Sequence, residues 1–136
     1  MSWTDSLIKL AGYEVDALQK RLAEVVDRRV QAEMKLVLLT AEGESEAAHA
    51  RGDAEAGLFQ TGFLEGLRIR KALAQIDIDR LGLEEAGARD ALAAAFEEQK
   101  KYEHVAAEMR QTEVKRAARV ETAALDEIGL RRAGAR

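Results

Sequence analysis

The chain has 136 residues, no proline and no cysteine, with 34% charged residues, 4% aromatic residues and a net charge of −4. The acidic balance argues against a nucleic-acid binder, and the lack of cysteine excludes disulfides and thiolate chemistry. Proline costs a helix interior about 3 kcal/mol, so a proline-free, Ala- and Leu-rich chain with many charges is typical of long helices and coiled coils. We predict one all-α domain spanning residues 1–136.

The first helix is predicted from about residue 4 to residue 41. Its apolar residues recur with alternating steps of three and four, which is the spacing of a coiled-coil seam. The alternative, an amphipathic helix of a globular bundle, would show a wider apolar stripe. The predicted seam positions, of which only the arginine is not apolar, are Ile8, Ala11, Val15, Leu18, Leu22, Val25, Arg29, Ala32, Leu36 and Leu39.

A glycine-rich segment follows the first helix. Half of the ten glycines lie between Glu42 and Gly66. Each glycine inside a helix costs about 0.5–1 kcal/mol relative to alanine. We therefore expect a chain reversal over about residues 42–62, with its tip near residue 58.

The second helix is predicted from about residue 63 to residue 131. Its apolar residues continue through a set whose register drifts before it settles between Leu92 and Met109; the set comprises Leu67, Leu73, Ile76, Leu81 and Leu83. Two helices around one reversal predict an antiparallel two-helix coiled-coil hairpin with a glycine-rich reversal. Because the second helix is longer, about the last twenty residues lack a full intramolecular partner. This pattern favours an interaction protein.

The sequence carries no convincing catalytic or metal motif. Glu46 and His49 match the Glu-x-x-His of di-iron bundles, but Lys101 stands where a second motif before His104 would need its glutamate. No nucleophile elbow or phosphate loop is present. We expect a non-enzyme with no catalytic residue, metal or cofactor. The chain also has no apolar run of about 18 residues and no signal peptide, which predicts a soluble cytoplasmic protein.

The closing part of the chain resembles a known family. Glu103 after the pair Lys100-Lys101, and then the run Arg119-x-Glu121-x-x-x-Leu125-Asp126-Glu127 with its basic end, are similar to the last helix of FliJ, a coiled-coil protein of flagellar type III export. The run from Tyr13 to Arg29 fits the opening helix of that family. The glycine-rich centre and the residues on either side of Glu103 depart from the family pattern.

The resemblance implies a function. FliJ-like proteins are cytoplasmic, stalk-like components, peripheral to the inner-membrane export apparatus. They bind the ring of the export ATPase and the cytoplasmic domain of the export gate, and they escort export chaperones. They have no catalytic activity of their own.

Two partner-binding sets are expected on this basis. The set expected to face the ATPase comprises Trp3, Leu7, Leu125, Ile128, Leu130, Arg131 and Arg132. The set expected to contact the gate, near the reversal, comprises Phe59, Phe63 and Leu67. In the alternative interpretation, Leu125 and Ile128 only close the hairpin against Leu7, and Phe63 only caps it.

A different class of protein is also compatible with the pattern. A self-associating scaffold coiled coil would form parallel dimers or filaments. A parallel dimer would gain nothing from five glycines in its middle, which favours the hairpin.

Overall fold

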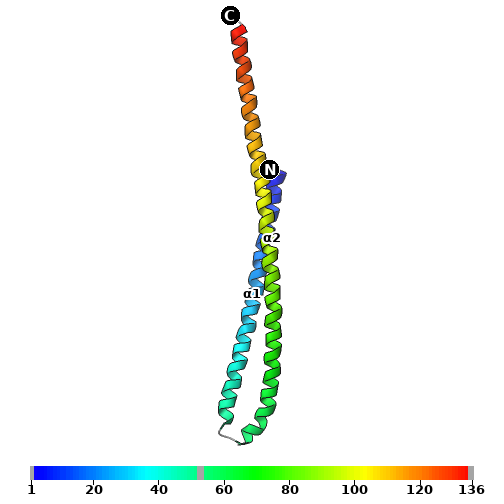
Figure 1. The fold of residues 1–136 in the computed structure, drawn as a ribbon, viewed down its shortest axis with the longest axis vertical. Coiled ribbons are helices and arrows are strands. Elements are labelled where there is room, and N and C mark those ends of the chain that lie inside the picture. Colours follow the sequence, from blue (N-terminus) through cyan, green and yellow to red (C-terminus); the bar gives the residue numbers. More distant parts are fainter. Residues whose placement is uncertain (1, 52–53, 135–136) are drawn as a thin grey trace. The chain divides into compact units, whose positions relative to one another are not determined.

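The computed structural model describes residues 2–51 and 54–134, and within them the fold is all-α. Helix α1 spans Trp3–Ala50 and helix α2 spans Ala54–Gly134 (Figure 1). Ser2 caps α1: its Oγ accepts a hydrogen bond from the backbone N–H of Asp5 at 3.3 Å, and the Asp5 carboxylate accepts one from the Ser2 nitrogen at 3.4 Å. This reciprocal pair satisfies amide donors that the first turn leaves free.

Both helices extend further into the glycine-rich segment than expected. α1 continues to Ala50 instead of ending near residue 41, and α2 begins at Ala54 instead of near residue 63. Gly52 and Asp53, which also belong to the predicted reversal, lie outside the described residues. Gly43 shows why a glycine here does not end the helix. It is buried where the two helices approach closely, and a Cβ atom added to it would collide with a δ-methyl group of Leu67 unless that side chain shifted.

The contacts divide the chain into two units. One unit comprises residues 16–93, and the other comprises residues 1–15 and 94–136. In the unit 16–93, the end of α1 and the beginning of α2 lie side by side as an antiparallel hairpin (Figure 1). Its hydrophobic cluster consists of Leu39, Leu67 and Ala74, with Leu36 and Phe63 packed against them. The predicted fold class is confirmed.

The seam predicted for α1 is also confirmed. Every predicted position from Ile8 to Leu39 is buried or half-buried. Val25 is fully buried at 0% exposure. Burying such a side chain contributes about 1.5–3 kcal/mol, so these positions carry much of the packing energy of α1.

The apolar positions predicted for the first part of α2 were right in part, because Leu67 and Leu81 are buried in the seam at 4% and 3% exposure. Leu73, Ile76 and Leu83 are 60%, 62% and 77% exposed, so they do not belong to the seam. The seam does not drift but follows one heptad pattern of buried and half-buried residues through small side chains. Its positions are Leu67, Lys71, Ala74, Ile78, Leu81, Glu85, Ala88, Leu92, Ala95, Gln99, Tyr102 and Ala106.

An ion cluster fills the seam where Arg29 interrupts the apolar pattern of α1. Arg29 Nε donates to Glu85 Oε2 at 2.6 Å, and Arg89 donates to the other oxygen of Glu85 at 2.7 Å. A second nitrogen of Arg29 reaches Glu33 at 2.8 Å. Arg29, the charged residue in the apolar seam of α1, is thus paired with Glu85 in the seam of α2. A charge inside a seam is tolerated when it is paired and hydrogen-bonded in this way.

The cluster shifts the pKa values of its members. Hydrogen bonds from Arg89 and then from Arg29 lower the pKa of Glu85 below its ordinary value of about 4.5, against an opposing effect of desolvation. Hydrogen bonds to Glu33 and Glu85 raise the pKa of Arg29. Because the folded-state pKa of Glu85 is depressed, its ionised form stabilises the hairpin above the ordinary pKa. That contribution is lost as the pH falls through the folded-state pKa.

In the other unit, the N-terminal part of α1 packs against α2 from residue 94 onward. Ala11, Val15, Ala95 and Ala106 are buried there. Tyr102 donates its hydroxyl proton to Glu98 at 2.7 Å, and this hydrogen bond raises the pKa of Tyr102. Past Ala106, every described residue from 107 to 134 is exposed. Met109, Arg110 and Glu113 still border a groove with Ser2, Thr4 and Asp5. The expectation that about the last twenty residues lack a full intramolecular partner agrees with the exposure of residues 117–134.

Candidate interaction surfaces

The exposed end of α2, residues 107–134, is the first candidate surface, and we call it the C-terminal arm. It is a regular helix that carries large hydrophobic side chains in the open. Their exposed fractions range from 45% to 74%, for Met109, Val114, Val120, Leu125, Ile128 and Leu130. Single exposed apolar residues are common on protein surfaces, and a series of them along one helix makes the arm a candidate for interaction.

The arm ends in basic residues. Arg131 and Arg132 occupy the last turn of α2, where positive charge complements the negative end of the helix dipole. Arg131 also donates to Glu127 one turn earlier, at 2.9 Å, and both side chains are largely exposed. An exposed pair of this kind contributes at most about 1 kcal/mol, so Arg131 can exchange Glu127 for an acidic partner at small cost.

The N-terminal members of the first predicted set lie elsewhere on this unit. Ser2, Thr4 and Asp5 line a groove of about 310 Å³ together with α2 residues between Ala106 and Glu113. Leu125 lies sixteen residues beyond Met109, which is about 24 Å along a helix. Trp3, 60% exposed, and the half-buried Leu7 therefore do not join Leu125, Ile128 and Leu130 in one cluster.

The exposure of the arm also decides the alternative interpretation of its apolar residues. Leu125 is 61% exposed and Ile128 is 49% exposed. They do not close the hairpin against Leu7, so that alternative was wrong.

The second predicted set, near the reversal, is not one surface. Phe59 is 79% exposed and borders a groove of about 260 Å³ with Glu46, Ala50, Gln60 and Phe63. Phe63 is half-buried against the hydrophobic cluster, as the capping alternative expected. Leu67 is 4% exposed and belongs to the cluster itself. Only Phe59 offers a large accessible apolar area.

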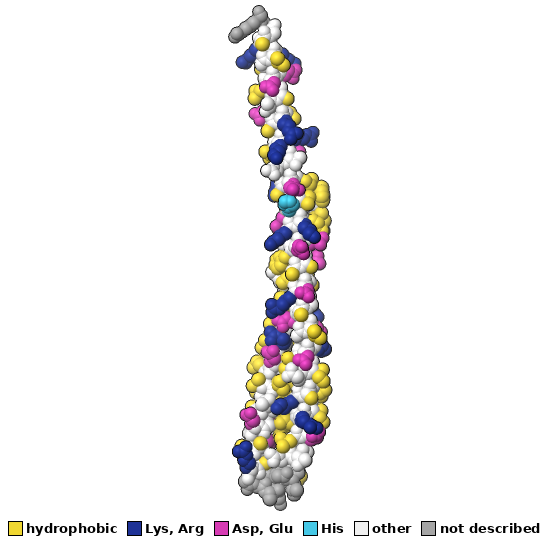
Figure 2. Space-filling view, viewed as in Figure 1, with side chains coloured by type: hydrophobic (Ala, Val, Ile, Leu, Met, Phe, Trp, Pro, Cys, Tyr) yellow, Lys and Arg dark blue, Asp and Glu magenta, His cyan; other side chains and the backbone are white. Residues whose placement is uncertain are grey.

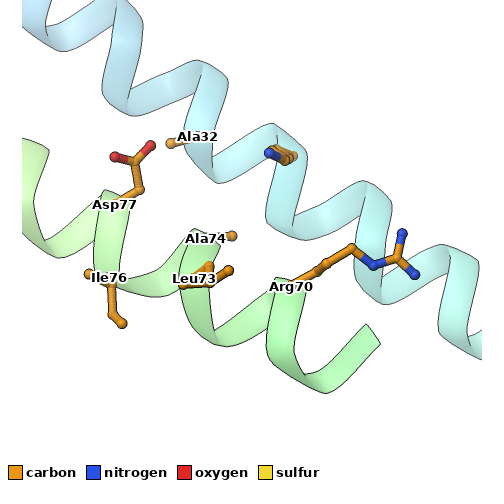
Figure 3. A pocket seen from close by; sticks show the side chains of 7 residues that line it. Ala32, Arg70, Leu73, Ala74, Ile76 and Asp77 are labelled. Atoms are coloured by element: carbon orange, nitrogen blue, oxygen red, sulfur yellow. The ribbon is translucent and has the colours of Figure 1, made fainter. Parts of the chain in front are cut away.

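A third surface, in the unit 16–93, was not predicted from the sequence. It is a groove of about 310 Å³ between α1 and α2, with Ala32 and Ala74 on its floor (Figure 3). Figure 2 shows hydrophobic side chains on the outer surface of this part of the hairpin. The remaining residues that line the groove are Lys35, Arg70, Leu73, Ile76 and Asp77.

Two of these lining residues, Leu73 and Ile76, had been expected in the seam. Their heptad spacing with Ile69 and Leu83 could have indicated a second apolar stripe on the same helix. That spacing is the signal by which the groove could have been found.

Other kinds of site find little support in the described part of the chain. Over residues 2–51 and 54–134, no three His, Asp or Glu side chains gather closely enough to bind a metal ion. His104 contacts Glu108 at 3.2 Å on the surface. Within the same ranges, neither helix combines the length and the apolar character needed to cross a membrane.

The fold and its exposed apolar surfaces define a helical-hairpin coiled coil. The family model described as "Flagellar FliJ protein" matches residues 4–136. Flagellar FliJ proteins from two strains of Caulobacter vibrioides, NA1000 and ATCC 19089, are each 48% identical to the chain over 131 residues, covering 96% of this chain and 94% of theirs. No solved structure matches. The chain belongs to the FliJ family, which associates it with flagellar protein export.

Proposed function

We propose that this protein is a non-enzymatic, stalk-like component of the flagellar export apparatus, and that its C-terminal arm binds the ring of the export ATPase. The observation that carries the proposal is the exposure of every described residue from 107 to 134. Membership of the FliJ family supports the association with export. The proposed location is cytoplasmic and peripheral to the inner membrane, through protein contacts alone and without nucleic acid.

The large apolar side chains of the arm are exposed to solvent, and this supports the proposal. A fully buried Leu or Ile side chain contributes about 1.5–3 kcal/mol relative to an exposed one. Leu125, Ile128 and Leu130 together can therefore supply several kcal/mol of binding energy to a partner that covers them. A single helix is also narrow, about 10–12 Å across with its side chains, which suits insertion into the opening of a ring.

The export gate is the second proposed partner, with its contact at the end of the hairpin near the reversal. Phe59 carries this proposal, because it is exposed beside a groove formed with Glu46 and Gln60. Leu67, and to a large extent Phe63, act by packing the hairpin beneath this surface. Export chaperones are a further proposed class of partner, to which no particular residues are assigned.

The test changes the apolar residues of the arm. We expect the double variant Leu125→Ser, Ile128→Ser to bind the export ATPase at least about tenfold more weakly, because two apolar anchors lose their contacts. Binding is measured by calorimetry and the stimulation of ATP hydrolysis by turnover assay. The matched control is Leu10→Ser, at a residue 62% exposed on α1, which leaves binding unchanged. Unaltered binding and stimulation with intact helical circular dichroism would refute the assignment of the arm.

A further inference from the structure

Helix α2 carries a second stripe, outside its seam, in the unit 16–93. The stripe repeats every three and four residues, like the seam, but it points to solvent. Ile69, Leu73, Ile76 and Leu83 are between 53% and 77% exposed. We call it the outer stripe; its positions are Gly62, Gly66, Ile69, Leu73, Ile76, Arg80, Leu83 and Gly87.

We propose that a second copy of this chain covers the outer stripe, with the two α2 helices antiparallel across a two-fold axis. A helix that carries two heptad stripes is suited to a bundle, because each stripe can form its own knobs-into-holes seam. An antiparallel pairing of one stripe with itself is self-complementary, as a closed two-fold interface requires. This inference does not rest on the proposed function, since it uses no residue of the C-terminal arm.

The sizes of the residues fit this pairing. With the axis between Leu73 and Ile76, Leu73 packs against the partner's Ile76, and Ile76 against the partner's Leu73. Leu83 then meets the partner's Gly66. Open space surrounds the position where a Cβ atom of Gly66 would lie, so a leucine side chain can occupy it. Arg80 lies across from the partner's Ile69, where its aliphatic stem can pack while its charged end stays in water.

The flanking charges select the second copy as the occupant. Arg70 and Asp77 lie on either side of Leu73 along α2, at equivalent positions of the heptad (Figure 3). In the antiparallel pairing, Arg70 faces the partner's Asp77, and Asp77 faces the partner's Arg70. The symmetry therefore yields two ion pairs, and the flanks bring no like charges directly opposite each other. Asp77 contacts Arg80 at 2.7 Å in an exposed pair, which contributes little and can rearrange.

The test is a charge exchange followed by sedimentation equilibrium of the full chain. We expect the native protein to dimerise, and Arg70→Asp or Asp77→Arg each to raise the dissociation constant by on the order of tenfold, because each places two like-charge pairs in the interface. The double variant R70D/D77R restores dimerisation. An equimolar mixture of the two single variants also restores it, because each supplies the charge that the other lacks.

Several outcomes would overturn the proposal. If the native chain stays monomeric at about 0.5 mM, a second copy does not cover the outer stripe, and the proposal is wrong. A double variant as weak as the single variants shows that these charges do not meet across an interface. Circular dichroism of all variants checks that the hairpin is folded. We expect substitutions at Arg70 and Asp77 to leave the helical signal unchanged. We expect the charge variants to bind the export ATPase as the native chain does, because Arg70 and Asp77 lie outside the arm. A failure of this proposal can therefore be told apart from a failure of the proposal for the arm.

Discussion

Replacing Leu67 by alanine is expected to lower the free energy of unfolding by about 2–5 kcal/mol, the usual range for truncating a buried leucine. Leu67 is 4% exposed and packs with Leu39 and Ala74, so its truncation removes buried apolar contacts from the hydrophobic cluster. The measurement is urea unfolding followed by circular dichroism. The variant's midpoint should fall with little change in the slope.

The matched control for Leu67 is Leu73→Ala, on the same helix. Leu73 is 60% exposed, and at a protein concentration low enough for the chain to be monomeric such a surface substitution usually changes stability by less than about 0.5 kcal/mol. Equal losses of stability in the two variants would mean that the seam of α2 runs through Leu73, as the sequence pattern first indicated. A stable Leu67→Ala variant with impaired binding to the export gate would instead restore Leu67 to the contact surface.

Replacing Gly43 by valine is expected to cost about 1–3 kcal/mol, through overpacking in the same region. The added Cβ atom would collide with the side chain of Leu67, and Leu67 is held in the hydrophobic cluster and cannot swing into solvent without losing its own burial. Thermal unfolding by calorimetry gives the comparison with the native chain.

The control for Gly43 is Gly82→Ala, in helix α2. No atom lies within 4 Å of the position of its Cβ atom, so alanine fits there and improves helix propensity by about 0.5–1 kcal/mol. The two substitutions are thus expected to change the free energy of unfolding in opposite directions. If Gly43→Val were as stable as the native chain, the close approach of the helices at this point would be wrong.

The seam of α1 could be predicted because its residues are large as well as regularly spaced. From Ile8 to Leu39 the spacing leaves one choice of buried face, and even Arg29 holds its seam position through Glu85. The seam of α2 could not be found in the same way. It relies on Ala74, Ala88 and Ala95, while larger apolar residues face solvent, so counting the largest side chains follows the wrong face.

The glycine-rich segment misled the prediction of helix ends for a related reason. The intrinsic cost of a glycine in a helix is known, but whether packing offsets that cost depends on the opposing helix. At Gly43 the opposing residue is Leu67, which the sequence does not reveal as a neighbour. Between residues 42 and 50 nothing else stops the helix, because proline is absent and alanines are frequent.

The candidate surfaces were predictable to different degrees. The arm followed from the unequal lengths of the two helices, which leaves the end of the longer one exposed in any antiparallel hairpin. Trp3 and Leu7 were grouped with the arm only because both termini were expected at one end, and the packing near Ala106 places them elsewhere. The outer stripe was missed because three of its apolar residues, Leu73, Ile76 and Leu83, were placed in the seam.

Hydrogen–deuterium exchange of the full chain, alone and with the export ATPase, tests most directly whether the C-terminal arm is the binding element. In the free protein we expect faster amide exchange in residues 114–134 than in the paired part of α2, because these residues are exposed and lie beyond the groove that the N-terminal residues share with α2. Addition of the ATPase should then protect those amides. Protection confined to residues 16–93, with the arm unchanged, would contradict the assignment of the arm.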